Sequence, residues 1–300
     1  MYKVLIISGP TAGGKSTLAV ELAKKYNGEI ISGDSVQVYK ELNIGSAKIK
    51  EEEMQGVKHH LIDVLSYKEN YSVYDFQRNG REAIEEIIAK NNLPIIVGGT
   101  GLYIKALLYD YQFPQESDKE DDYQALDNEA LYQMIKDKDE EAALKLHVNN
   151  RKRLIRTLKL MEALPDNKTS FLADQTHQPL YDILIIGLDI ERPLLHERIN
   201  ERVEQMWDNG LVKEVEELYA KDKDLFSYQA LQAIGYREFE AYFSQESSLE
   251  EVKEKIKSHT RQFAKRQYTW FNHQLPVNWV SISDDKYRET IEELIDNWNK

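Results

Sequence analysis

Gly9-Pro10-Thr11-Ala12-Gly13-Gly14-Lys15-Ser16 decides the fold of this chain, because it fits the phosphate-binding pattern G-x-x-x-x-G-K-[ST]. The run before it, Lys3–Ser8, is short, apolar and β-branched, which predicts a buried parallel strand. Residues 16–27 after it carry apolar side chains at helical spacing, and Gly28 is the expected end of that helix. A glycine loop between a strand and a helix gathers several free backbone N–H groups at the N-terminus of that helix. These N–H groups and the positive end of the helix dipole bind phosphate oxygens.

The chemistry of this loop predicts a site for a di- or triphosphate. Lys15 adds a point charge, and the Ser16 hydroxyl is suited to bind Mg²⁺, which is the cofactor that we expect. The alternative is a glycine turn with a purely structural role. The residues expected to bind the diphosphate or nucleotide are Gly9, Pro10, Thr11, Ala12, Gly13, Gly14, Lys15, Ser16 and Thr17.

Composition places the chain among soluble globular proteins. It has 300 residues, of which 41% are hydrophobic and 30% charged. The absence of cysteine excludes disulfides, thiolate zinc sites and a cysteine nucleophile. The N-terminus does not resemble a signal peptide, and no run approaches the roughly 20 apolar residues of a membrane span. We therefore expect a cytoplasmic protein without a membrane partner.

The net charge of −13 argues against a protein that coats nucleic acid non-specifically. Cations nevertheless gather in two acid-free stretches. Residues 151–159 hold five cations, and residues 258–268 hold Arg261, Lys265 and Arg266. On helices, each stretch would present a basic face, which is either a solvated surface or a docking site for a polyanion.

Strand-like runs alternate with helical patterns along the chain, which predicts an α/β fold with a doubly wound parallel sheet. The expected strands are residues 3–8, 29–32, 60–64, 94–98 and 182–190. Ligands of such sheets bind at the carboxyl ends of the strands. This places residues 9–16, 33–37, Asp63 and 98–101 around one crevice.

The alternation stops between the fourth and fifth strands, where the sequence has helical patterns and prolines but no convincing strand. We predict a P-loop catalytic core formed by residues 1–113 and 181–300, and a helical insertion at residues 114–180. After residue 190 the pattern is helical almost to Pro276, and residues 277–283 suggest a short strand before a final helix.

Two further loops of the crevice carry candidate catalytic groups. Asp34 follows the second strand and is well placed as a general base, although an Asx-turn or helix cap is the alternative. Thr100 stands among three glycines after the fourth strand, either beside a ligand or in a tight turn. His59 and His60 would point to opposite faces of a strand, so we expect them to pack rather than to bind a metal.

Several motifs resemble the bacterial tRNA dimethylallyltransferases (tRNA isopentenyltransferases), in the order of that family and over nearly the whole chain. Three of them together are specific: Asp-Ser-x-Gln, Gly-Gly-Thr-Gly-Leu-Tyr and Ala-Lys-Arg-Gln-x-Thr-Trp. The matching stretches are residues 9–16, 34–39, 45–48, 59–63, 98–103, 149–156, 232–238 and 260–271.

The resemblance implies transfer of a dimethylallyl group from dimethylallyl diphosphate to N6 of adenosine 37 in tRNA, with Mg²⁺. It also implies that the insertion grips the anticodon stem-loop. For this reaction the candidate catalytic residues are Asp34 as base, Thr100 to orient the amine or a phosphate oxygen, and Lys15 to stabilise the leaving diphosphate. We expect a monomer.

Contacts with tRNA are expected from the Asp34 loop, the Thr100 loop, the basic helices and the Gly-Tyr-Arg segment. These residues are Asp34, Ser35, Val36, Gln37, Thr100, Lys152, Arg153, Arg156, Gly235, Tyr236, Arg237, Arg261, Lys265 and Arg266. The sequence departs from the family pattern at Val148, Asn150, Asn272 and residues 166–169, mostly in tRNA-binding parts.

Two other functions fit parts of the sequence. A P-loop small-molecule or nucleoside kinase would use the phosphate loop and Asp34, but it leaves the glycine loop at 98–101 and the basic helices without a purpose. A nucleotide-switched RNA-binding protein would hydrolyse ATP or GTP slowly, but the chain lacks an obvious guanine-specificity motif.

Overall fold

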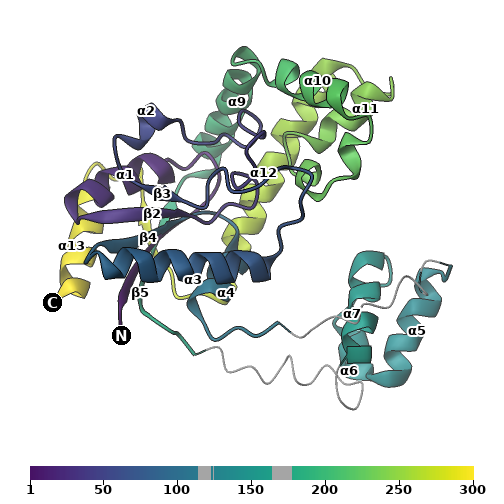
Figure 1. The fold of residues 1–300 in the computed structure, drawn as a ribbon, viewed down its shortest axis with the longest axis horizontal. Coiled ribbons are helices and arrows are strands. Elements are labelled where there is room, and N and C mark those ends of the chain that lie inside the picture. The colour runs from purple at the N-terminus through teal and green to yellow at the C-terminus, as the bar shows by residue number, and fades with distance from the viewer. Residues whose placement is uncertain (114–122, 124, 164–177) are drawn as a thin grey trace. The chain divides into compact units, whose positions relative to one another are not determined.

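The computed structural model describes residues 1–113, 123, 125–163 and 178–300. Six parallel strands form one sheet in the order β3-β2-β4-β1-β5-β6, which confirms the predicted doubly wound α/β class (Figure 1). The strands are β1 (Lys3–Ser8), β2 (Gly28–Ser32), β3 (His59–His60), β4 (Leu93–Val97), β5 (Asp182–Asp189) and β6 (Asn278–Ser281).

Alternate side chains of the sheet enter two separate cores. In β1, Leu5 and Ile7 pack with α1 (Lys15–Lys25) and α13 (Tyr287–Asn299). Val4 and Ile6 pack in a larger cluster on the opposite face. The helices of that cluster are α3 (Val73–Ala89), α4 (Gly101–Leu108), α9 (Arg192–Asp208), α10 (Leu211–Lys221) and α12 (Leu249–Gln274). Helices on both faces explain why the four central residues of β1, Val4 to Ile7, are all apolar instead of alternating with polar residues.

Short helical segments complete this part of the chain. They are α2 (Glu51–Met54), α11 (Glu240–Phe243) and three 3₁₀ turns at Leu225–Ser227, Gln229–Gln232 and Arg237–Phe239. Among the described residues, no helix combines the length and the apolar character needed to cross a bilayer.

The chain divides into two compact units: Met1–Tyr109 with Pro179–Lys300, and Asp110–Gln178. The described part of the second unit consists of helices α5 (Asn128–Lys138), α6 (Glu140–Leu144) and α7 (Arg151–Ala163). Residues 114–122, 124 and 164–177 of the predicted insertion lie outside the described residues.

The second unit has a hydrophobic core of its own. Leu131 and Ile135 of α5 pack against Leu154 and Leu158 of α7, and all four are fully buried. The Arg151 guanidinium fastens the start of α7, because it donates hydrogen bonds to the backbone carbonyls of Leu126 and Tyr123 at 2.7 and 3.0 Å. Arg151 therefore supports the unit itself, although it belongs to the acid-free basic stretch.

Two element boundaries differ from the predicted ones. Helix α1 ends at Lys25, and the left-handed turn after it falls on Asn27, so Gly28 begins β2 instead of ending the helix. Strand β3 has two residues instead of the predicted five, because Leu61 and Asp63 adopt positive φ angles that break the extended backbone.

A loss of packing in the second unit should destabilise that unit alone, because its hydrophobic core is separate from those of the first unit. We expect Leu158→Ala to destabilise this unit by about 2–4 kcal/mol. Hydrogen exchange should become faster at the amides of α5 and α7 and remain unchanged in β1 and β4. Equally accelerated exchange in β1 would show that the two cores unfold together.

Candidate active site at the carboxyl ends of the strands

The order of the strands brings three loops to one edge of the sheet. Strand β4 lies between β2 and β1, so the loops after β1, β2 and β4 emerge side by side. Gly33 donates its N–H to Val97 O at 2.7 Å, and Gly98 donates to Ile7 O at 3.3 Å. The phosphate loop, the Asp34 loop and the Thr100 loop therefore adjoin one another at this edge.

The phosphate loop leaves the N-terminus of α1 open for an anion. Gly14 at the N-cap has a φ of 81°, and no side chain caps the helix. The first turn of α1 contains no acidic residue, so the positive end of its dipole is not neutralised from within the turn. Ser16 and Thr17 are exposed in that turn.

Lys15 folds back over its own loop. Its Nζ donates hydrogen bonds to the carbonyls of Gly9 and Pro10 at 3.1 and 2.6 Å. Burial, reinforced by the positive charge of Arg202, lowers the pKa of Lys15 to about 7, while the carboxylate of Asp34 raises it. The ammonium thus lies where an anion is needed to stabilise it.

Arg202 is a candidate site residue that the sequence patterns did not predict. It belongs to α9, and burial lowers its pKa while the carboxylates of Asp34 and Glu53 raise it. Its side chain therefore lies close enough to interact electrostatically with Lys15 and Asp34. Lys15, Arg202, Asp34 and, beside Arg202, Glu53 therefore form one cluster of charges, and its two basic side chains suit a diphosphate. The sequence offered no signal, because Arg202 stands in a helix of mixed charges.

Asp34 forms an Asx-turn, the structural role given above as the alternative to a general base. Its Oδ1 accepts hydrogen bonds from the backbone N–H groups of Val36 and Gln37 at 2.8 and 3.3 Å. Its Oδ2 has no hydrogen-bond donor within the described part of the chain. Because Asp34 also interacts electrostatically with Lys15 and Arg202, the turn holds the carboxylate in the site and leaves one oxygen available.

Thr100 stands at the N-cap of α4, but its hydroxyl does not cap the helix. The hydroxyl can therefore serve a ligand instead. The glycines on either side are required by close packing against α12. A Cβ on Gly99 would lie 1.9 Å from Gln267 Nε2, and a Cβ on Gly101 would lie 2.0 Å from the Trp270 ring.

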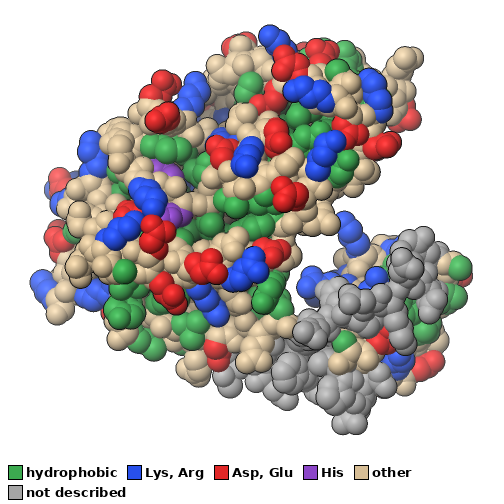
Figure 2. Space-filling model, viewed as in Figure 1, with side chains coloured by type: hydrophobic (Ala, Val, Ile, Leu, Met, Phe, Trp, Pro, Cys, Tyr) green, Lys and Arg blue, Asp and Glu red, His purple; other side chains and the backbone are tan. Residues whose placement is uncertain are grey.

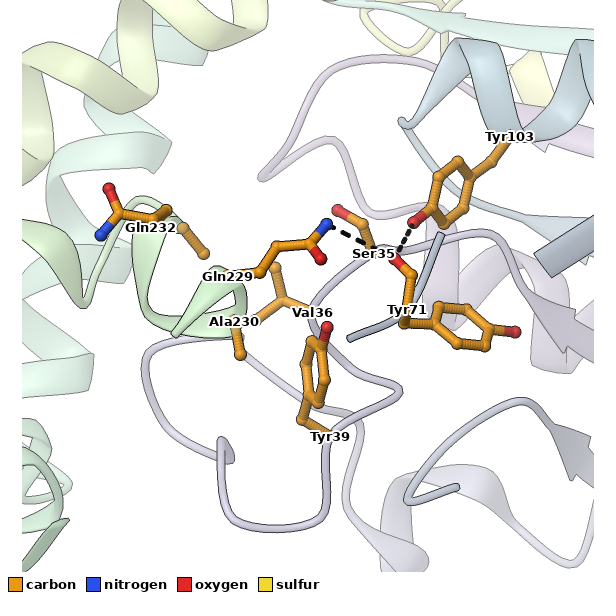
Figure 3. Close-up of a pocket in the computed structure, with 9 residues that line it drawn as sticks. Ser35, Val36, Tyr39, Tyr71, Tyr103, Gln229, Ala230 and Gln232 are labelled. Carbon is orange, nitrogen blue, oxygen red and sulfur yellow. Dashed lines mark hydrogen bonds between the residues drawn. The ribbon is translucent and has the colours of Figure 1, made fainter. Parts of the chain in front are cut away.

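A cavity of about 200 Å³ opens beside the Asp34 loop (Figure 3). Its residues come from the Asp34 loop, α4, the segment before α3 and the 3₁₀ turn at Gln229–Gln232. Burial raises the pKa of Tyr71 to about 12, and those of Tyr39 and Tyr103 also rise, so these hydroxyls stay protonated at neutral pH. The lining residues are Ser35, Val36, Tyr39, Tyr71, Tyr103, Gln229, Ala230, Gln232 and Ala233.

The structure places Gln37 and Tyr236 inside a hydrogen-bonded scaffold. The Gln37 amide accepts a bond from the Ser32 hydroxyl at 3.2 Å and lies 3.4 Å from Ala47 O. Tyr236 is 0% exposed, and its hydroxyl donates to Glu214 Oε1 at 2.8 Å. Its ring packs so closely on Gly45 that a Cβ there would lie 2.6 Å away. This position does not support the predicted contact of the Tyr236 side chain with tRNA.

Its neighbours Gly235 and Arg237 also have partners within the protein. Gly235 has a φ of 100°, and its N–H donates to the buried Glu238 carboxylate at 2.9 Å. Arg237 Nε donates to the same carboxylate at 3.0 Å, and its side chain is 38% exposed. Part of the Arg237 guanidinium therefore faces solvent, where a phosphate contact remains a prediction.

The cations of α12 divide into two groups. Lys257 and Lys253 form ion pairs with Glu204 of α9 at 2.6 and 3.1 Å, so they join the two helices. Lys265 and Arg266 are exposed and line a hollow of about 550 Å³ with Gln262, Thr269 and Trp270.

Arg261 lies between these two groups and donates to Asn200 Oδ1 at 2.6 Å. In the second unit, Lys152, Arg153 and Arg156 are exposed on α7. Figure 2 shows Lys and Arg side chains interspersed with Asp and Glu over the visible face of the first unit.

His59, His60 and Asp63 have structural partners. His59 Nδ1 lies 2.9 Å from Val57 O, and His60 Nε2 lies 2.7 Å from Glu29 Oε2. Asp63 pairs with the buried Lys48 ammonium at 2.5 Å. Within the described residues, no group of three or more His, Asp or Glu side chains is arranged to hold a metal ion.

The sequence model of the family described as IPP transferase matches residues 37–274. The chain belongs to the IPP transferase family. The matched range begins after the phosphate loop, which the family match does not include. The family predicted from the sequence motifs is thus confirmed, and its membership favours the prenyltransferase interpretation over a kinase or a nucleotide-switched binding protein.

Named relatives extend this match over nearly the full length. The chain is 46% identical over 286 residues to a tRNA dimethylallyltransferase of Anoxybacillus flavithermus, covering 94% of this chain and 91% of that protein. It is 46% identical over 294 residues to a tRNA dimethylallyltransferase of Enterococcus faecalis, covering 94% and 92% of the two chains.

Solved structures agree with these relatives. A tRNA isopentenylpyrophosphate transferase of Staphylococcus epidermidis matches with a TM-score of 0.74 and 38% identity, over 100% of this chain and 99% of that one. A eukaryotic dimethylallyltransferase described as acting on tRNA matches with a TM-score of 0.86 and 28% identity, over 99% and 79% of the chains.

The lowered pKa of Lys15 predicts a pH-dependent stability. Between pH 7 and the ordinary value of 10.5, the unfolded chain binds more protons at this position than the folded protein does. The free energy of unfolding should therefore rise with pH, by about 1–2 kcal/mol from pH 7 to 9 relative to Lys15→Met. Urea titrations of both proteins measure this difference, and parallel pH profiles would contradict it.

Proposed function

We propose that this chain transfers the dimethylallyl group of dimethylallyl diphosphate to N6 of adenosine 37 in tRNA. The observation that carries the proposal is the grouping of Lys15, Arg202 and Asp34 at one edge of the sheet, beside the open N-terminus of α1. This transfer requires cations that bind the diphosphate and a carboxylate that accepts the proton released from N6. The names of the relatives support the substrate class.

The diphosphate of the donor would occupy the phosphate loop. The N–H groups at the start of α1, Lys15 and Arg202 would stabilise the negative charge that grows on the leaving oxygen. A bound diphosphate also raises the pKa of Lys15, because an adjacent anion favours the ammonium. Lys15 would then exchange its bonds to Gly9 O and Pro10 O for the phosphate oxygens.

Mg²⁺ fits this arrangement as an ion held chiefly by the donor. Mg²⁺ commonly uses one or two protein oxygens together with substrate phosphates. The exposed Ser16 hydroxyl in the first turn of α1 is suited to be that protein ligand. The ion would supply additional neutralisation of the diphosphate charge.

The acceptor step requires an amine and a base in line with the allylic carbon. The N6 lone pair forms the new C–N bond while the allylic C–O bond breaks and its electron pair leaves with the diphosphate. The proton released from N6 passes to Asp34, whose Oδ2 is available, and the Thr100 hydroxyl orients the amine or a phosphate oxygen. Proximity of the three loops supports these roles.

The acceptor adenine must leave the stacked anticodon loop to reach this edge, which single-stranded loops permit at low energetic cost. The cavity between Ser35 and Tyr71 is suited to an unstacked base, because RNA bases commonly stack on tyrosine rings. We propose that Lys265 and Arg266 contact phosphates. The exposed cations of α7 would hold the anticodon stem-loop through the second unit, as the predicted insertion requires.

Replacement of Asp34 by Asn tests the base. Asn keeps the Oδ1 acceptor of the Asx-turn but cannot take up the N6 proton at neutral pH. We expect the single-turnover rate with saturating dimethylallyl diphosphate to fall about 10²-fold or more, and the affinity for tRNA to change little. Radiolabelled donor and filter binding measure these two quantities.

The matched control is Asp284→Asn, because Asp284 Oδ1 also accepts a backbone N–H two residues later, from Lys286 at 2.9 Å. This variant should transfer at the wild-type rate. An Asp34→Asn enzyme with normal turnover would remove Asp34 from the chemistry. Labelled ATP offered with small acceptors tests the kinase alternative, and phosphorylation without prenylation of tRNA would overturn the proposed function.

The RNA surface of α12 is tested by salt dependence. The double variant Lys265→Ala, Arg266→Ala should weaken tRNA binding and lower the slope of log Kd against log salt by about one to two, while the KM for the donor stays unchanged. Lys213→Ala is the control, since this lysine on α10 is 81% exposed and outside the site. Unchanged salt slopes would exclude these two side chains from phosphate contacts.

A further inference from the structure

Gln267 of α12 joins two loops of the active site. Its Oε1 accepts a hydrogen bond from the backbone N–H of Thr11 in the phosphate loop at 2.9 Å. Its Nε2 donates to the carbonyl of Gly99, next to Thr100, at 3.1 Å. Gln267 is only 6% exposed, and both hydrogen bonds are at least partly buried. One amide therefore connects two loops that lie far apart in the sequence.

The chemistry of the partners fixes which end of the amide faces each loop. The Thr11 N–H can only donate, so it requires the Gln267 oxygen. The Gly99 carbonyl can only accept, so it requires the Gln267 nitrogen. A carboxylate of the same shape would satisfy the first partner and repel the second. The site thus demands an amide at this position and not merely a polar side chain.

Close packing leaves this link little freedom. A Cβ on Gly99 would meet Gln267 Nε2 at 1.9 Å and lie 3.6 Å from Gly9 O. Two residues on, a Cβ on Gly101 would meet the Trp270 ring of α12 at 2.0 Å. The glycines thus let α12 sit directly on the Thr100 loop, with Gln267 reaching across to the phosphate loop.

We propose that Gln267 is a positioning residue for the transfer reaction: it fixes the spacing between the loop that binds the diphosphate and the loop that carries Thr100. This inference rests on the proposed function of the site. Because bond formation requires the amine and the allylic carbon in line, a displacement of about 1 Å between the two loops lowers the rate by on the order of 10²-fold.

The effect should appear in the rate of transfer rather than in tRNA binding. Gln267 lies on the buried side of α12 that contacts the two loops, whereas the cations proposed to bind RNA, Lys265 and Arg266, are exposed on the same helix. A variant at residue 267 should therefore keep its tRNA affinity while the chemical step slows. A general loss of folding would lower both quantities together.

Three variants separate positioning from stability. Gln267→Met removes both hydrogen bonds at similar volume, and Gln267→Glu removes only the donor to Gly99. Gln77→Met is the matched control, because Gln77 is also buried and donates to a backbone carbonyl, that of Ala106, at 2.7 Å. Single-turnover rates with both substrates saturating, tRNA Kd and thermal unfolding are measured for each folded protein.

We expect both Gln267 variants to transfer about 10²-fold more slowly with tRNA Kd within about twofold of the wild type. Gln77→Met should lower the unfolding temperature and keep the rate. The Glu variant has an additional signature, since its protonated carboxyl regains a donor for Gly99 O and burial raises its pKa. Its rate relative to the wild type should therefore recover as the pH falls from 8 to 6.

Wild-type transfer rates in the Gln267 variants would overturn the inference. An equal loss of transfer rate in Gln77→Met would also overturn it. A Glu variant whose rate ratio does not change with pH would show that the donor to Gly99 is not what matters, even if Gln267→Met fails to fold. Failure of the wild-type enzyme to prenylate tRNA would instead refute the proposed function, so the two failures are distinguishable.

Discussion

Parallel pairing of β4 between β1 and β2 is the constraint on which the site depends. The carboxyl ends of these three strands must lie at one edge, and the hydrogen bonds from Gly33 to Val97 and from Gly98 to Ile7 continue the sheet into the loops. Apolar side chains on both faces of β1 hold the strand between two layers of helices. The phosphate loop, Asp34 and Thr100 are thereby gathered without any of them being close in sequence.

Glycine determines how closely the helices approach this edge. Gly99 and Gly101 have no side chains, so α12 lies directly on the Thr100 loop through Gln267 and Trp270. Gly45 provides the same close contact for the buried Tyr236 ring. Segments that follow β5 in the chain therefore pack against loops that precede it. This explains why residues of the C-terminal half contribute to a site formed at the ends of the N-terminal strands.

The charges around Lys15 support the proposed binding of an anion. Burial and the positive charge of Arg202 lower the pKa of Lys15, and the carboxylate of Asp34 offsets this only in part. Holding two cations close together in a partly buried site raises the free energy of the empty protein, and a bound diphosphate would lower it. Further along α12 the pairing of Lys253 and Lys257 with Glu204 shows that a basic stripe in a sequence can serve helix packing instead of RNA.

The sequence by itself determined the sheet class, the strand, glycine loop and helix at the start of the chain, and the family, because these depend on local patterns: apolar runs and glycine spacing. It placed Asp34 and Thr100 at the right edge for the same reason. Only the tertiary structure decided that Arg202 enters the site, that Tyr236 is buried and that Gln267 spans two loops. Each of these depends on contacts between residues far apart in the chain, and a charge, a ring or an amide looks the same in the sequence whether it faces solvent, a core or a ligand.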